Sequence, residues 1–257
     1  MESIPVSAEG LSAGYSSPVV EDICFNVRQG EIMTLVGPNG SGKSTLLKTL
    51  ASCLEKLGGT VFFDGEDTDN IPTGEKAKKL SIVLTERIHP DLMTCRDVVE
   101  TGRYPYTGRM GLLKDADRKA AQEAIEMVGA EDLADKDFSE ISDGQRQRIM
   151  LARAICRQPH ILILDEPVSY LDLYYKLAFL EILRKLADEK RLAVIISMHE
   201  LELASKISDH VIALKNGRAL YSGKPEDIFT KDIIMELFDI PEKLYDKYYI
   251  NTMKGKM

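Results

Sequence analysis

Residues 37–45 combine glycines, a lysine and hydroxyl side chains at a spacing that suits phosphate binding. They match the pattern GxxxxGK[ST], between an apolar strand predicted at 32–36 and a helix predicted at 44–57. Glycines let backbone N–H groups turn toward phosphate oxygens, and the positive end of a helix beginning near Lys43 adds attraction. The Lys43 charge suits the β- and γ-phosphates, and the Ser44 hydroxyl suits Mg²⁺. The predicted phosphate-binding residues are Gly37, Pro38, Asn39, Gly40, Ser41, Gly42, Lys43, Ser44 and Thr45.

Two adjacent acids, Asp165 and Glu166, end an apolar run at 161–164. Continuous apolarity predicts a strand buried on both faces, and ligands of open α/β sheets bind at the carboxyl ends of strands. We expect Asp165 to hold Mg²⁺ and Glu166 to polarise an attacking water. Alone, such acids can simply end a strand. Together with the phosphate loop, they predict hydrolysis of a nucleoside triphosphate.

The composition is that of a mildly acidic globular chain. It has 257 residues, 44% of them hydrophobic, and a net charge of -8. This balance argues against nucleic acid as the main partner, because phosphate backbones recruit excess Lys and Arg. The longest apolar runs, 161–164 and 192–196, are far shorter than the ~20 residues that cross a bilayer, and no signal peptide is apparent. The four cysteines are scattered without a CxxC pair, so we expect reduced, mostly buried thiols in a cytosol.

Strand and helix patterns alternate along most of the chain, which predicts a largely parallel sheet covered on both faces. Turns are predicted at Glu9-Gly10, Gln29-Gly30, Asp64-Gly65 and Asn216-Gly217. Further strands are predicted at 60–63, 80–84, 161–164, 192–196, 211–214 and 218–221, and further helices at 115–128 and 174–190. Between residues 86 and 157 the pattern is helical, as an insertion between two strands would be.

The segment 139–148 could supply a second anion site. It reads Ser-Glu-Ile-Ser-Asp-Gly-Gln-Arg-Gln-Arg and precedes an amphipathic run at 149–156. Ser142 suits an N-cap, Gly144 allows close backbone approach, and a helix start of this kind attracts anions. By itself the segment favours an ordinary capped helix.

The same segment carries a resemblance to a known family. Residues 141–145, Ile-Ser-Asp-Gly-Gln, resemble the LSGGQ signature of ATP-binding cassette (ABC) ATPases, and Ser142 lies 23 residues before Asp165, as in that family. Tyr15 looks like the aromatic residue that stacks on adenine, residues 169–172 are similar to the D-loop, and His199 matches the switch histidine. The resemblance extends from about residue 6 to residue 229, in the family's order and spacing.

The resemblance implies an α/β fold with a P-loop NTPase (RecA-like) core, a mostly parallel sheet, an N-terminal antiparallel β region and an inserted helical subdomain. We expect one domain, with its core at 1–85 and 158–230, the helical subdomain at 86–157 and a tail at 231–257.

The resemblance also implies ATP and Mg²⁺ as cofactors and a head-to-tail homodimer. Each ATP would lie between one phosphate loop and the other subunit's Ser142, Gly144 and Gln145, with His199 at the γ-phosphate. Further implied partners are integral membrane permease subunits supplied in trans, at the cytoplasmic face of the membrane, and an extracytoplasmic binding protein, with no nucleic acid.

Four residues, at three places in the chain, depart from the family pattern. Thr85 and Glu86 stand where a Gln usually follows the strand at 80–84, so Thr85 becomes a candidate Mg²⁺ ligand and the coupling to the permease at this loop is in question. Asp143 replaces the usual Gly of the signature, and Glu200 replaces a common Asp after the switch histidine.

The segment 98–107, Val-Val-Glu-Thr-Gly-Arg-Tyr-Pro-Tyr-Thr, and residues 83–87 before it resemble ATPases of importers for iron-siderophores, haem and cobalamin. Two alternatives are a soluble ABC ATPase for cofactor assembly, similar to iron–sulfur scaffold ATPases, and a module that binds ATP with little turnover. The cargo is chosen by other subunits, so this chain does not specify it, and transport direction rests on the resemblance.

Overall fold

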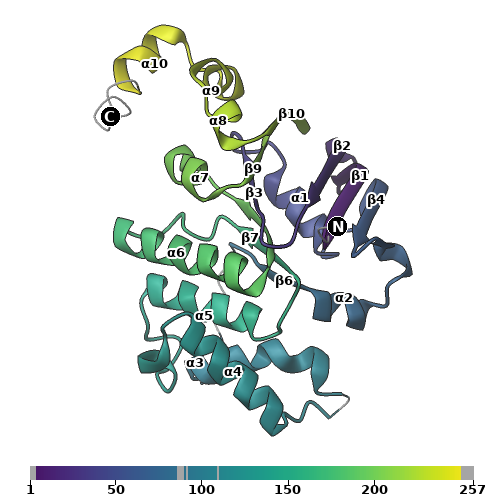
Figure 1. The fold of residues 1–257 in the computed structure, drawn as a ribbon, viewed down its shortest axis with the longest axis vertical. Coiled ribbons are helices and arrows are strands. Elements are labelled where there is room, and N and C mark those ends of the chain that lie inside the picture. Colours follow the sequence, from purple (N-terminus) through teal and green to yellow (C-terminus); the bar gives the residue numbers. More distant parts are fainter. Residues whose placement is uncertain (1–3, 86–89, 91, 109, 250–257) are drawn as a thin grey trace.

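A central six-stranded sheet carries helices on both faces, and a smaller antiparallel sheet lies beside it (Figure 1). The computed structural model describes residues 4–85, 90, 92–108 and 110–249. The strand order is β10-β9-β3-β8-β7-β6, and only β9 and β10 pair antiparallel. The strands are β3 (Ile32–Val36), β6 (Leu80–Val83), β7 (Ile161–Asp165), β8 (Ala193–Ser197), β9 (His210–Lys215) and β10 (Arg218–Gly223).

Strands β3, β7 and β8 are buried at every residue, as their continuous apolar sequences predict. Alternate side chains enter two different cores. In β7, Leu162 and Leu164 pack with the helices on one face, while Ile161 and Ile163 pack with α1 (Lys43–Leu50) and the antiparallel sheet on the other. The predicted α/β class with a mostly parallel sheet is therefore confirmed.

The antiparallel sheet corrects one sequence prediction. It has the order β2-β1-β4-β5, with β1 (Val6–Gly14), β2 (Pro18–Val27), β4 (Lys56–Phe63) and β5 (Glu66–Asp67). The turn predicted at Glu9-Gly10 is wrong, because β1 runs through both residues and pairs with β2 on one side and β4 on the other. The register shifts between Ala8 and Leu11, so the glycine marks a β-bulge instead of a turn.

The helix predicted over 44–57 is also too long, since α1 ends at Leu50. The chain leaves the helix at Ser52, whose φ is 57°, and residues 56–63 instead form β4 beside β1. Pairing with a neighbouring strand outweighs the helical preference of this short segment. The other helices are α2 (Thr73–Lys79), α3 (Cys95–Glu100), α4 (Asp115–Met127), α5 (Asp143–Ile155), α6 (Leu173–Lys190), α7 (Leu201–Ile207), α8 (Pro225–Ile228), α9 (Lys231–Phe238) and α10 (Glu242–Tyr248), with 3₁₀ helices η1 (Thr68–Asn70), η2 (Thr101–Tyr106) and η3 (Glu131–Leu133).

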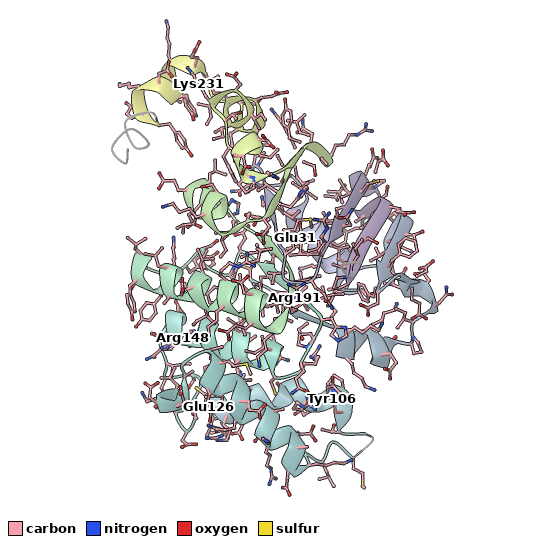
Figure 2. The ribbon with its side chains drawn as sticks, viewed as in Figure 1. Glu31, Tyr106, Glu126, Arg148, Arg191 and Lys231 are labelled. Carbon is pink, nitrogen blue, oxygen red and sulfur yellow. The ribbon has the colours of Figure 1, made fainter. Side chains whose placement is uncertain are left out.

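Helices α3, α4 and α5 follow β6 in the chain and gather at one end of the molecule, while α8, α9 and α10 lie at the other end (Figure 1). Lys231 is labelled in the C-terminal group in Figure 2. It forms ion pairs with Glu242 and Asp246, each at 2.8 Å, and these pairs join α9 to α10. Within the described residues, no helix is long and apolar enough to cross a membrane.

The prediction of mostly buried thiols is only half right. All four cysteines are unpaired with one another, but Cys24 and Cys53 are exposed. Burial raises the pKa of Cys95 to about 11 and that of Cys156 to about 12. These two thiols therefore stay protonated near neutral pH and act as small apolar side chains.

The segment 98–107 forms the end of α3 and the helix η2, and it ties the helical region together. Arg103 is buried and its guanidinium lies 3.0 Å from the Asp117 carboxylate of α4 and donates to the Cys156 carbonyl at 2.9 Å. Tyr106, labelled in Figure 2, packs its ring against the same guanidinium. Its hydroxyl donates to the Arg157 carbonyl at 2.9 Å. The segment thus connects α3, α4 and the end of α5.

Arg103→Met should therefore destabilise the protein by about 3–5 kcal/mol, because it leaves the Asp117 carboxylate buried without its cation. The free energy of unfolding in urea measures this. Lys119→Met is the matched control, since Lys119 forms an exposed pair with Glu123 at 3.8 Å and should change stability by under about 0.5 kcal/mol. Equal effects of the two variants would contradict the assigned role of Arg103.

Candidate nucleotide site

The phosphate loop joins β3 to α1 at the carboxyl edge of the central sheet. Gly42 is the N-cap of α1 and has a φ of 99°, in the left-handed region. A Cβ atom there would lie 2.3 Å from Cγ1 of Val20, so both the backbone geometry and the packing require glycine. The predicted start of the helix at Lys43 is confirmed.

Lys43 is almost fully buried, and its ammonium donates to the carbonyls of Gly37 at 2.8 Å and Pro38 at 3.1 Å. Burial lowers the pKa of Lys43 from its usual value, while attraction from Glu166 and Asp165 acts in the opposite direction. A negatively charged ligand bound beside this ammonium would therefore offset the free-energy cost of burying its charge.

The loop borders a hollow of about 170 Å³ that also reaches Glu166. Its lining consists of Val19, Asn39, Gly40, Gly42, Lys43, Ser44, Thr45 and Glu166. Beside it, the buried hydroxyl of Ser41 finds no hydrogen-bond partner among the residues described. A buried hydroxyl of this kind is costly unless a ligand supplies its partner, so the loop fits a phosphate oxygen.

Asp165 ends β7, and three neighbouring elements converge on it. Its Oδ1 accepts hydrogen bonds from Ser44 at 3.0 Å and from Ser197 at 2.7 Å. The Thr85 hydroxyl, just after β6, donates to the Asp165 carbonyl at 2.9 Å. Sequence reasoning missed Ser197, although it follows the apolar run 192–196 just as Asp165 follows 161–164. Glu86 lies outside the described residues.

Glu166 follows in a left-handed conformation, with a φ of 50°. Its backbone N–H donates to Ser197 Oγ at 2.9 Å, which turns the side chain toward the hollow. Its Oε1 lies 2.5 Å from Nε2 of His199, and its Oε2 accepts from the Ser169 hydroxyl at 3.3 Å. Two candidate catalytic side chains predicted from separate segments therefore meet at one point.

Tyr15 is exposed over 64% of its surface and lies outside the lining of the hollow. It follows β1 in the loop that leads to β2, and the same hairpin supplies Val19 to the lining. The exposed ring remains a candidate for stacking on a nucleobase at the outer end of this hollow.

The signature segment begins α5 with the predicted cap. The Ser142 hydroxyl accepts from the Gln145 N–H at 3.3 Å, and the Gln145 side chain accepts from the Ser142 N–H at 3.0 Å. Asp143, the unusual residue here, pairs with Arg146 at 2.9 Å. The pairing offsets a negative charge that would otherwise oppose anion binding at this helix start.

Ser142, Gly144 and Gln145 do not line the hollow at the phosphate loop. The signature residue Asp143 and the nearby Arg146 border a second small cavity of about 50 Å³, which also has Glu166 in its lining. This cavity is lined by Thr85, Asp143, Arg146, Gln147, Glu166, Pro167, Tyr170 and Leu171. Within one chain, the two predicted anion sites are therefore separate.

Gly144 has a packing role that sequence reasoning missed. The ring of Tyr175, in the first turn of α6, lies so close that a Cβ on Gly144 would approach its Cγ to 2.7 Å. Glycine at this position thus lets the first turn of α6 pack directly on the start of the signature helix.

Gly144→Ala should cost about 1–3 kcal/mol of stability through this overlap with the Tyr175 ring. In a Tyr175→Ala background the same change should become neutral or stabilising, because alanine favours helices over glycine. Urea unfolding of the four proteins measures the coupling. Gly74→Ala is the control, since Gly74 is likewise the second residue of a helix and nothing lies within 4 Å of its added Cβ. An unchanged cost in the Tyr175→Ala background would contradict the overlap.

The ABC transporter family model matches residues 20–169. An uncharacterized ABC transporter ATP-binding protein of Methanocaldococcus jannaschii is 44% identical over 243 residues, which cover 94% of this chain and 84% of that protein. The iron(3+)-hydroxamate import ATP-binding protein of Bacillus subtilis is 35% identical over 240 residues, covering 93% and 89% of the two chains.

A dimeric structure of a bacterial ABC transporter cassette superposes with a TM-score of 0.75 at 26% identity, covering 86% of this chain and 98% of the other. The family match extends over more than half of the sequence and includes the phosphate loop, the signature segment and the paired acids. The geometry of the site and the two relatives agree with it, and the chain belongs to the ABC transporter family as one of its ATPases.

Proposed function

We propose that this chain is the ATP-hydrolysing subunit of an importer of metal chelates such as iron-siderophore, haem or cobalamin, and that it works as a homodimer. The observation that carries the proposal is the contact of Glu166 with His199 at the hollow bordered by the phosphate loop. The import function rests on the named hydroxamate importer relative and on the segment 98–107.

The residues present fit ATP and Mg²⁺. The phosphates would take the place beside the Lys43 ammonium and satisfy the orphaned Ser41 hydroxyl. Ser44 Oγ and Asp165 Oδ1 lie 3.0 Å apart and offer the oxygen ligands that Mg²⁺ prefers, with the Thr85 hydroxyl close by as a further candidate. When bound, Mg²⁺ would neutralise charge on the phosphates.

Glu166 is the group suited to activate water. Its carboxylate would accept the water's proton as the water oxygen bonds to the γ-phosphorus, and the bond from that phosphorus to the β–γ bridging oxygen breaks. The products are ADP and inorganic phosphate. His199, held beside the carboxylate, would donate a hydrogen bond to the γ-phosphate as negative charge develops there.

The separation of the two anion sites favours a dimer. Ser142, Gly144 and Gln145 do not line the hollow of their own chain, so the helix start they form would reach phosphate in a partner's hollow. The bacterial cassette that superposes on this chain is itself dimeric, which supports the proposal of a dimer. ATP would thus be bound between two subunits, and hydrolysis would release them.

Glu166→Gln should lower Mg²⁺-dependent ATP hydrolysis by at least about 10²-fold, because the general base is lost while ATP binding is retained. With ATP and Mg²⁺ this variant should sediment as a dimer, and the added Ser142→Arg change should return it to a monomer. Phosphate release and analytical ultracentrifugation measure the two effects. Equal hydrolysis by wild type and Glu166→Gln would refute the assignment, and negligible hydrolysis by wild type would favour a binding module.

A transport role predicts a membrane partner supplied in trans, which would place this chain at the cytoplasmic face of the membrane. Co-purification of the tagged chain from detergent-solubilised membranes of its source organism should recover a protein with many membrane-spanning helices. Mass spectrometry identifies the partner, and an extracytoplasmic binding protein should associate with the same complex. Recovery of a soluble scaffold protein in its place would favour the assembly ATPase.

A further inference from the structure

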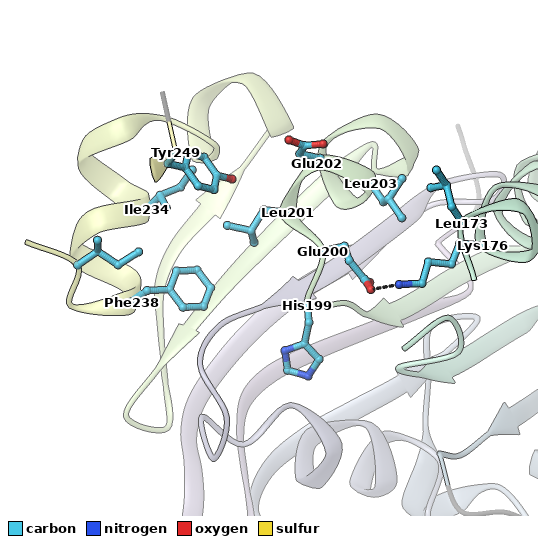
Figure 3. A pocket seen from close by; sticks show the side chains of 11 residues that line it. Leu173, Lys176, His199, Glu200, Leu201, Glu202, Leu203, Ile234, Phe238 and Tyr249 are labelled. Carbon is cyan, nitrogen blue, oxygen red and sulfur yellow. Dashed lines mark hydrogen bonds and ion pairs between the residues drawn. The ribbon is translucent and has the colours of Figure 1, made fainter. Parts of the chain in front are cut away.

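A largely apolar hollow of about 540 Å³ lies beside His199, between the start of α6, the start of α7 and the C-terminal helices (Figure 3). Its wall carries an ion pair that sequence analysis did not anticipate. Lys176 Nζ lies 2.5 Å from Oε1 of Glu200, and the two side chains are only 18% and 32% exposed. Figure 3 shows this pair immediately beside His199.

The Glu200 side chain does not cap the helix that it precedes. It is the N-cap residue of α7, yet its side chain makes no capping hydrogen bond and turns to Lys176 instead. Its Oε2 is buried and has no hydrogen-bond partner among the residues described. Lys176 therefore compensates the negative charge of this carboxylate. Glu200 directly follows His199 in the chain.

The pair completes a series of hydrogen bonds and chain segments that begins and ends at Glu166. The Ser169 hydroxyl donates to the Glu166 carboxylate, and the chain continues from Ser169 to Asp172, which caps α6. The N–H of Lys176 donates to the Asp172 carbonyl at 3.0 Å. Through Glu200 and the adjoining His199, the series returns to Glu166.

We propose that Lys176 and Glu200 are positioning residues. Their ion pair would fix the backbone at His199 and Glu200 relative to Glu166 and to the segment 169–172. The inference rests on the catalytic roles proposed above for Glu166 and His199. Without Lys176, the ion pair that connects Glu200 to α6 is lost. The partly buried Glu200 carboxylate, which follows His199 in the chain, also becomes an uncompensated negative charge.

A steady-state ATPase assay of the full chain tests this inference. Lys176→Met should lower kcat by about tenfold or more, the scale expected when a catalytic group is misplaced. KM for ATP should change by less than about threefold, because the phosphate loop is untouched. Lys176→Arg should recover most of kcat. Lys185→Met, an equal charge change at an exposed site of the same helix, should match wild type.

A double-mutant cycle gives a second criterion that does not depend on the stability of one variant. Glu200→Gln alone should lower kcat, and Lys176→Met with Glu200→Gln should lose no more than the worse single variant, because the two residues act as a unit. Additive losses, or a Lys176→Met kcat within twofold of wild type, would overturn the inference. If Glu166→Gln remains inactive in that case, the proposed function stands while the positioning role fails.

Discussion

The site depends on how one buried carboxylate, that of Asp165, is satisfied. A carboxylate at the end of a fully buried strand needs hydrogen-bond donors, and here they come from Ser44 at the start of α1 and Ser197 at the end of β8. These bonds join the phosphate loop to the two central strands. Because Ser197 also accepts the Glu166 N–H, the orientation of the candidate base depends on the same hydroxyl.

A second constraint links this centre to the helical region. Tyr175 packs on Gly144, and its neighbour Lys176 binds Glu200, so adjacent residues of one helical turn contact the signature helix and the histidine turn. A movement of α6 would therefore change both the contact with Gly144 and the ion pair with Glu200. Such a connection would link events at the phosphates to the signature helix.

The segment 98–107 has a different importance. Its resemblance to importer ATPases led to a functional expectation, while the structure reveals an internal anchor built on the buried Arg103–Asp117 pair. Tyr106 and Arg103 both bind carbonyls at the end of α5, so the anchor also supports the helix that begins with the signature. A motif can thus mark a family through the packing it requires.

Local patterns were sufficient to predict the phosphate loop, the acids at 165 and 166, the cap at Ser142 and the α/β class. Each depends on residues close in sequence, such as glycines for a tight loop or apolar runs for buried strands. The same patterns erred at Glu9-Gly10 and at residues 51–57, where pairing between β1 and its neighbours decided the conformation.

Contacts between distant residues could only come from the tertiary structure. The bond of Ser197 to Asp165, the meeting of Glu166 with His199, the Tyr175 ring on Gly144 and the Lys176–Glu200 pair each join separate segments. Parallel strands bring their carboxyl ends to one edge of the sheet, but which side chains touch there depends on the packing of the helices around it. The sequence alone therefore determined what kind of chemistry this protein performs, and the tertiary structure decided which partners hold the reacting groups in place.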